Sequence, residues 1–337
     1  MKTLKLLPFI FIIVSCRNMD FSNNPYAELF STHAASRAVN YKATDQWQNR
    51  IYPIDEIHID FVKQLNEVDG FPNIPKVSEK TIEFTQMAAA LRAEMNPEVN
   101  RLFDKYLKGI YICTDLGGQA ITGYIYKTAG DEKGNNAIGG FIILDSSRFD
   151  KPANEWITEK EMRPFDGRKN RIELKIENER GNTVRNTLRY VLLKEFGYIL
   201  GNTLGLFPDM RLQKREFAGF PLLNDIWIEK GTVYDKEEFE GRSKVQFYGF
   251  RKIKLDEKWQ DIYNPVAKLP FPTLMSAMSP DEFVSEYFVS WVHVVLDKRP
   301  WELKIYREDK EVFSMGNGIT DKRTEKYRKM LTKELGL

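Results

Sequence analysis

The chain has 337 residues, of which 42% are hydrophobic and 29% charged. This composition is typical of a folded globular protein with one large or two modest domains. Lys2 and Lys5 account for the formal net charge of +2, so the rest of the chain is neutral. A neutral chain gives no electrostatic basis for binding nucleic acid, and we expect no nucleic-acid partner.

The N-terminus has the pattern of an export signal. Two lysines precede an apolar stretch, Leu6–Val14, which is too short to span a bilayer of roughly 30 Å as a helix. Residues 13–16 read Ile-Val-Ser-Cys and resemble a bacterial lipobox, in which the cysteine is lipidated and becomes the mature N-terminus. We expect residues 1–15 to be a lipoprotein signal peptide and Cys16 to anchor an exported protein in the bacterial cell envelope, in the outer membrane if the cell is Gram-negative. The alternative is a plain secretory signal with an incidental Cys16.

Residues 16–106 are predicted to begin as a tether and to continue into two helices. Residues 16–50 are polar and aperiodic, which predicts a tether, and residues 51–75 contain three prolines, which predicts irregular, docked structure. From Ser78 to Met95, apolar residues recur mostly every third or fourth position, the spacing of a helix face. A second helix is predicted after Asn96-Pro97.

The remaining elements predict an α+β protein with strands before a long central helix. Strands rich in β-branched and aromatic residues are predicted at Gly109–Cys113, Ile121–Tyr126 and Ile138–Leu144, with turns at Gly117-Gly118 and Asp131–Asn136, and an alternating strand at Arg171–Ile176. Helices are predicted at about Val184–Leu200, Ser279–Leu296 and Asp321–Leu335, and a short strand at Leu303–Tyr306. Residues 205–272 show little periodicity and are predicted to form loops and short elements.

The central helix carries a motif that zinc enzymes use, with its metal ligands replaced. Residues 192–201 read Leu-Leu-Lys-Glu-Phe-Gly-Tyr-Ile-Leu-Gly. In an H-E-x-x-H helix, two histidines four residues apart hold Zn²⁺ and the glutamate acts on the bound water. Here Glu195 stands at the glutamate position, but Lys194 and Tyr198 stand at the histidine positions. A protonated lysine has no lone pair for a metal, and a neutral phenol is a poor ligand.

This frame resembles the zincin metallopeptidases. Residues 281–288, Asp-Glu-Phe-Val-Ser-Glu-Tyr-Phe, are similar to the E-E-x-F-A-E-x-F segment of the gluzincin type, and residues 139–145 and 154–165 resemble bacterial lipoproteins of a zinc-dependent peptidase family. The resemblance, which spans roughly residues 105–295, implies a zincin-like domain at 51–337, divided near residue 204. It also implies that Glu195 keeps the general-base position, Glu282 the third ligand position and Glu286 an adjacent acid. The third histidine of the metzincin type would fall at Leu204.

Three functions remain open. The first is a lipid-anchored pseudo-metallopeptidase that has no zinc or other cofactor and uses its cleft to bind a protein or peptide. The second is a surviving hydrolase that works through Glu195 with another metal set or without a metal. The third is a surface lipoprotein with a structural or host-interaction role. If Glu195 and Glu282 face a site without a metal, their charges repel. We therefore expect Lys194 to supply the missing cation and the Tyr198 hydroxyl to bond a carboxylate, unless Lys194 points into solvent.

The other candidate ligands offer little for a site. Cys113 is predicted to be a small buried strand residue, and it has no disulfide partner if Cys16 is lipidated. His33 falls in the predicted tether and His58 in the irregular segment. His293 is predicted to be a packed core histidine, although its spacing also allows it to share a helix face with Glu286.

Overall fold

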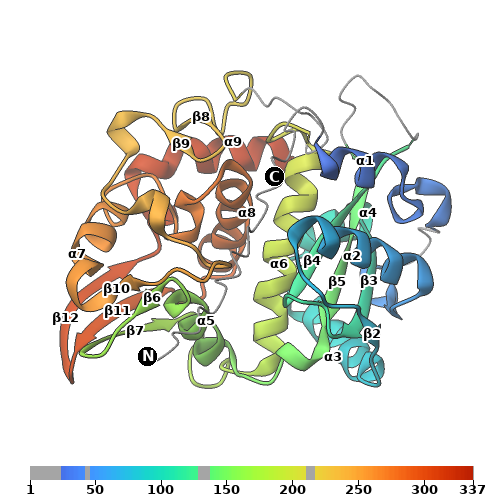
Figure 1. Cartoon of the computed structure of the whole chain (residues 1–337), viewed down its shortest axis with the longest axis horizontal. Coiled ribbons are helices and arrows are strands. Elements are labelled where there is room, and N and C mark those ends of the chain that lie inside the picture. Colours follow the sequence, from blue (N-terminus) through green and yellow to red (C-terminus); the bar gives the residue numbers. More distant parts are fainter. Residues whose placement is uncertain (1–23, 42–45, 128–136, 210–216, 337) are drawn as a thin grey trace, which may run out of the picture.

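The structure is a computed structural model that describes residues 24–41, 46–127, 137–209 and 217–336 (Figure 1). The predicted signal peptide, Cys16 and the predicted turn at Asp131–Asn136 lie outside the described residues. The chain contains both helices and a mixed β-sheet, which confirms the α+β class. Among the described residues, no helix is long and apolar enough to cross a membrane.

A five-stranded mixed sheet forms the core of the N-terminal half. Its strand order is β1-β3-β5-β4, and β2 (Lys76–Val77) pairs with β3. The strands β1 (Ile51–Pro53), β3 (Leu107–Thr114) and β5 (Gly139–Asp145) are parallel, whereas β4 (Ala120–Ile125) runs antiparallel to β5 at one end of the sheet. Every residue of β5 is buried, which fits the apolar run Phe141–Leu144 at its centre. The three predicted strands of this region are therefore present, with ends shifted by one or two residues.

Two predictions for the first 75 residues need correction. The described part of the predicted tether contains α1 (Pro25–Thr32) and short 3₁₀ turns, and buries Leu29, Phe30 and Trp47 against the rest of the protein. The predicted irregular segment contains α2 (Glu56–Asp69), which buries Phe61 and Val62. The prolines of this segment flank α2 instead of interrupting it, and polar residues on its outer face hide its apolar stripe.

The ends of α2 show why the helix forms there. The side chain of Asp55 accepts a hydrogen bond from the backbone N–H of His58 at 2.9 Å, which caps the first turn. Gly70 ends the helix with φ of 78°, a left-handed conformation that glycine adopts without a Cβ penalty. The two helices predicted next are α3 (Thr81–Glu94) and α4 (Pro97–Tyr106), the second of which is capped by Asn96.

The long helix α6 (Val184–Thr203) connects the two halves of the molecule (Figure 1). It begins at the predicted cap, Thr183, and packs against both β4 and α8 (Pro280–Ser290). The contact with α8 is close because Gly197 has no side chain: a Cβ there would lie 2.9 Å from the Cα of Ser285. A π-helical turn, Trp291–Leu296, continues α8 to the predicted end of that helix.

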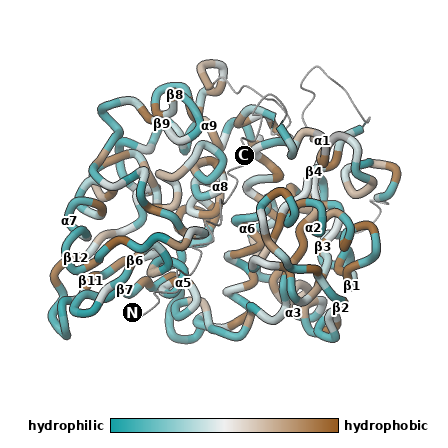
Figure 2. Tube along the Cα trace, in the orientation of Figure 1, coloured by the Kyte–Doolittle hydropathy of each residue, from teal (hydrophilic) through white to brown (hydrophobic). Residues whose placement is uncertain are grey.

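The C-terminal half surrounds α8 with small sheets and helices. An antiparallel sheet of order β12-β11-β7 is formed by β7 (Asn170–Lys175), β11 (Glu302–Arg307) and β12 (Lys310–Gly316). Two short strand pairs add to this half: β6 (Phe165–Asp166) pairs with β10 (Ile253–Lys254), and β8 (Trp227–Glu229) pairs with β9 (Thr232–Val233). Its helices are α5 (Ala153–Met162), α7 (Leu255–Val266) and α9 (Glu325–Leu335). The sequence did not predict α5, α7 or β12. The hydropathy along the chain is highest on the central strands and the helices beside them and lower at the outer ends of β7, β11 and β12 (Figure 2).

Candidate functional site

A cleft of about 730 Å³ lies between the two halves of the chain. Helix α6 contributes Val191, Lys194 and Glu195, and the edge strand β4 contributes Ala120 and Ile121. The end of α2 and residues 117–119 continue the β4 side. Across from them stand α5 and the segment 247–252. The volume is within the range of roughly 300–1,000 Å³ that small-molecule and peptide-sized ligands occupy.

An ion pair joins α6 to α8 between two positions at which the zincin resemblance predicts metal ligands. The Lys194 Nζ lies 3.2 Å from a carboxylate oxygen of Glu282, and the two side chains are only 6% and 13% exposed. The same ammonium donates a hydrogen bond of 3.2 Å to the Tyr248 hydroxyl and lies 5.3 Å from the centre of the Tyr198 ring. The two ligand positions on α6 thus hold an ammonium and an aromatic face.

The surroundings of Lys194 keep it charged. Burial alone lowers the pKa of a lysine, but here the negative charge of Glu282 and the neighbouring phenols and Glu195 outweigh burial and raise the pKa of Lys194 well above its usual range. The ammonium therefore persists at neutral pH and has no lone pair to offer a metal.

Glu195, for which the zincin resemblance predicts the general-base position, is held by the edge strand. The Thr122 hydroxyl on β4 donates a hydrogen bond of 2.7 Å to its carboxylate. Burial raises the pKa of Glu195, and the charge of Lys194 and the bond from Thr122 offset only part of that shift. Glu195 is thus a weakened acid at the cleft wall.

A second buried ion pair, not predicted from the sequence, lies one turn further along α8. Lys160 on α5 places its Nζ 3.2 Å from Glu286, whose other carboxylate oxygen accepts a hydrogen bond of 3.0 Å from Thr273. Burial lowers the pKa of Lys160, although Glu286 opposes the shift. Next to it, burial raises the pKa of Glu161 to about 7, and Tyr263 donates a hydrogen bond of 2.8 Å to that carboxyl group.

The structure brings together most of the residues that the sequence pointed to. Lys194, Glu195 and Glu282 gather at the α6–α8 contact, and the expected ion pair of Lys194 is formed with Glu282. Among the described residues, no carboxylate accepts the hydrogen bond expected from Tyr198, which presents its ring to Lys194 instead. Glu286 is adjacent as expected, but it is paired with Lys160.

Residues that the sequence analysis missed come from distant elements. Tyr248 and Thr122 reach the site from 54 and 73 positions away along the chain. Lys160 and Glu161 fall inside a segment that carries the family resemblance, yet nothing in their local sequence distinguishes them from solvated helix residues. Only the position of α5 against α8 shows that both are buried.

The three histidines do not contribute to the site. His293 is fully buried; its Nε2 lies 2.8 Å from the carbonyl oxygen of Ile176, and its Nδ1 lies 3.0 Å from the Arg189 guanidinium. Burial lowers the pKa of His293 to about 3, so it is a neutral core residue, as predicted. His33 contacts Asp60 of α2, and His58 lies in the first turn of α2, where it contacts Asp55.

The donor set does not fit zinc. A structural or catalytic zinc site uses three or four protein ligands. Of the three positions that the zincin resemblance implies, Lys194 is protonated, Tyr198 turns its ring to that ammonium, and Glu282 is committed to the ion pair. Within the described residues, no three histidine, cysteine or acidic side chains are arranged to hold a metal ion.

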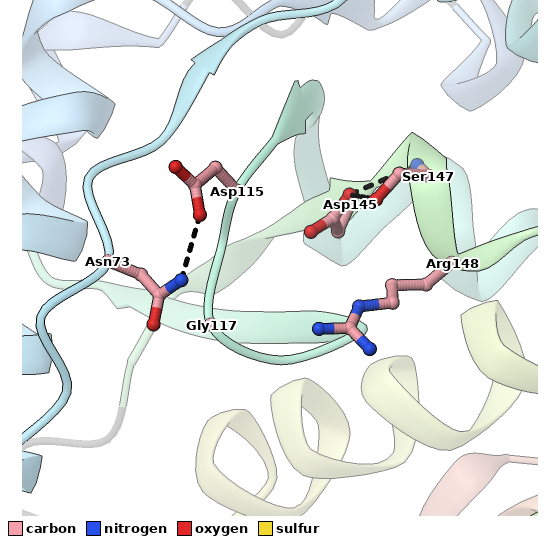
Figure 3. A pocket seen from close by; sticks show the side chains of 6 residues that line it. All are labelled: Asn73, Asp115, Gly117, Asp145, Ser147 and Arg148. Carbon is pink, nitrogen blue, oxygen red and sulfur yellow. Dashed lines mark hydrogen bonds between the residues drawn. The ribbon is translucent and has the colours of Figure 1, made fainter.

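A smaller pocket of about 380 Å³ adjoins the cleft and shares Gly117 and Arg148 with it (Figure 3). Its two carboxylates already have partners. Asp145 accepts hydrogen bonds from the backbone and hydroxyl of Ser147 at 3.0 and 2.6 Å, and Asp115 accepts one from Asn73 at 2.8 Å. No hydrogen bond joins Arg148 to either carboxylate in this view. The pocket extends the cleft, and the Arg148 guanidinium can interact there with a ligand.

Comparisons of the chain with protein-family models, with curated proteins and with solved structures found no significant match.

Proposed function

We propose that the protein is a lipid-anchored pseudo-metallopeptidase: a zincin-like domain whose zinc site has been replaced by an internal ion pair. The observation that carries the proposal is the buried contact of Lys194 on α6 with Glu282 on α8. The zincin resemblance pairs these two positions, 88 residues apart, as ligands of one metal. Their proximity supports that reading, and a lysine there supplies a positive charge without a metal.

The remaining role is binding, for which the edge strand β4 offers a suitable surface. Backbone groups of successive strand residues point to opposite edges. The Ile125 carbonyl is bonded on the β5 side, whereas the N–H and C=O of Tyr126 are bonded on the outer side, to residues 36 and 38. The backbone groups of Ala120 and Thr122 share the parity of Tyr126, so they point to the outer edge beside the cleft. An extended peptide can add to such an edge.

The test is the metal content and the hydrolytic activity of the purified protein. After dialysis against zinc-containing and then metal-free buffer, elemental analysis should find no stoichiometric zinc, and a mixture of unstructured peptides should remain uncleaved with or without a chelator. Chelator-sensitive cleavage with about one zinc per chain would refute the proposal. Mass spectrometry of membrane-extracted protein tests the anchor separately, because an unmodified Cys16 or an intact Met1 contradicts it.

One observation favours a second candidate, a hydrolase that works without zinc. Glu195 lines the cleft with a raised pKa and a fixed orientation, which are the properties of a general acid or base. Peptide cleavage that resists chelators and is lost on Glu195→Gln would favour this candidate over the binding role.

A further inference from the structure

The cleft has three basic side chains that the protein itself does not neutralise. Arg148, Arg163 and Lys252 line the cleft and are exposed. In the described part of the chain, no acidic side chain lies within ion-pair distance of any of the three. The two other lysines of the cleft, Lys160 and Lys194, are neutralised from behind by Glu286 and Glu282.

A series of contacts places Arg163 and Lys252 on the α5 side of the cleft, and Arg148 at the end of the cleft where residues 117–119 meet α5. The Gln119 side chain donates to the carbonyl oxygen of Arg148 at 3.3 Å and accepts a hydrogen bond of 2.8 Å from Trp156 on α5. Arg163 follows the last residue of the same helix, and Lys252 donates a hydrogen bond to the Arg163 carbonyl oxygen. We call Arg148, Arg163 and Lys252 the basic wall.

The acids of the cleft belong to other elements. Asp69 is the last residue of α2 and accepts a hydrogen bond from Tyr26. Glu195 is on α6, and its carboxylate accepts a hydrogen bond of 2.7 Å from the Thr122 hydroxyl. A ligand in the cleft therefore meets three exposed cations along the basic wall, whereas the acids of the cleft and of the adjoining pocket already accept hydrogen bonds within the protein.

We propose that the occupant of the cleft is an acidic peptide, bound extended along β4 with carboxylates directed at the basic wall. This inference rests on the proposed binding function and specifies its ligand. A peptide is favoured over a nucleic acid because β4 offers backbone hydrogen bonds, and because Asp69 repels a continuous line of phosphates. Three cations match a few carboxylates, whereas nucleic-acid binding proteins typically neutralise more phosphates.

The test is fluorescence anisotropy with short labelled peptides of alternating valine and one polar residue. The polar residue is glutamate, glutamine or lysine in three otherwise identical probes, and a labelled single-stranded oligonucleotide is the fourth probe. The glutamate peptide should bind on the order of tenfold more tightly than the glutamine peptide, and added salt should weaken it, because the basic wall is exposed to solvent. The lysine peptide should bind most weakly.

Matched variants locate the effect. The triple substitution Arg148→Gln, Arg163→Gln and Lys252→Gln should weaken the glutamate peptide on the order of tenfold and leave the glutamine peptide unchanged, since each exposed ion pair contributes roughly two- to fivefold. The control is a triple substitution to glutamine of exposed lysines that do not line the cleft, at Lys310, Lys322 and Lys333. It removes the same charge and should change neither affinity.

Three results would overturn the inference. Equal binding of the glutamate and glutamine peptides removes the preference for acids but leaves a peptide-binding cleft. Tighter binding of the oligonucleotide assigns the basic wall to another ligand class. Binding of none of the probes rejects an acidic peptide, while the zinc measurement still decides separately whether the metal site has been lost.

Discussion

Replacing Lys194 by methionine tests the internal cation most sharply. Methionine keeps much of the length and the apolar stem of the side chain and removes only the charge. In the parent protein the ammonium is 6% exposed and lies 3.2 Å from Glu282, which is 13% exposed. The substitution leaves the Glu282 carboxylate buried beside an apolar group, while Tyr248 loses a hydrogen-bond donor.

The expected cost is about 3–5 kcal/mol in the free energy of unfolding, the usual result of removing one partner of a buried ion pair. For a chain of this length that loss corresponds to a fall of roughly 4–7 °C in the melting temperature. Because the folded state raises the pKa of Lys194, its contribution is fully present below the unfolded value of 10.5 and is lost only as pH rises through the higher folded value. The difference between parent and variant should therefore be constant from about pH 6 to pH 9.

Thermal and urea unfolding, followed by circular dichroism, measure the loss. Lys194→Met combined with Glu282→Gln should recover part of it, because the second change removes the stranded carboxylate. Lys258→Met, which removes surface ion pairs with Glu240 and Asp261, is the control and should leave the melting temperature nearly unchanged. If Lys194→Met is as stable as the parent, or if the double variant is less stable than the single one, the ion pair does not hold α6 to α8 and the reasoning fails.

Two further predictions concern the buried surroundings of the site. The folded state raises the pKa of Glu161 from 4.5 to about 7, so the contribution of Glu161 to stability is greatest below pH 4.5 and is lost as pH rises through 7. Glu161→Gln can still accept the hydrogen bond from Tyr263, and it should make the protein about 3 kcal/mol more stable at pH 8. The fall of the melting temperature between pH 5 and pH 8 should become less steep in this variant. An unchanged pH dependence would contradict a raised pKa of Glu161. Gly197→Ala should destabilise the protein by about 1–3 kcal/mol in urea unfolding, because the new methyl group meets Ser285 on α8. The cost of this clash exceeds the gain in helix propensity from alanine. A more stable variant would show that α6 and α8 can move apart without cost.

The elements that the sequence predicted well are those with strong local signals. Buried β-branched strands gave β3 and β5, and caps at Thr183 and Ser279 gave the starts of α6 and α8. Helix α2 was missed because the prolines on both sides of it are typical of irregular structure, although its apolar residues lie on one helix face. A proline shows where a helix cannot continue, but it does not show whether the residues before or after it form a helix.

The site was predictable only where the motif itself carried the information. The spacing of Lys194 and Tyr198 placed both on one face of α6, and the resemblance at Glu282 placed an acid opposite them. Nothing in the sequence near Lys160 or Tyr248 could have added them, because their roles follow from the packing of α5 and of the segment 247–252 against α6 and α8. Pairings between distant segments depend on the fold as a whole.

The zinc stoichiometry of a rebuilt motif tests the central claim most directly. Lys194→His together with Tyr198→His restores both histidine positions on α6 and frees Glu282 as the third ligand. After dialysis, elemental analysis should find about one zinc per chain in this double variant and none in the parent, and Glu282→Ala in the rebuilt background should lower the content again. Stoichiometric zinc in the parent, or a correctly folded double variant that binds none, would contradict a zincin-like site occupied by an internal cation.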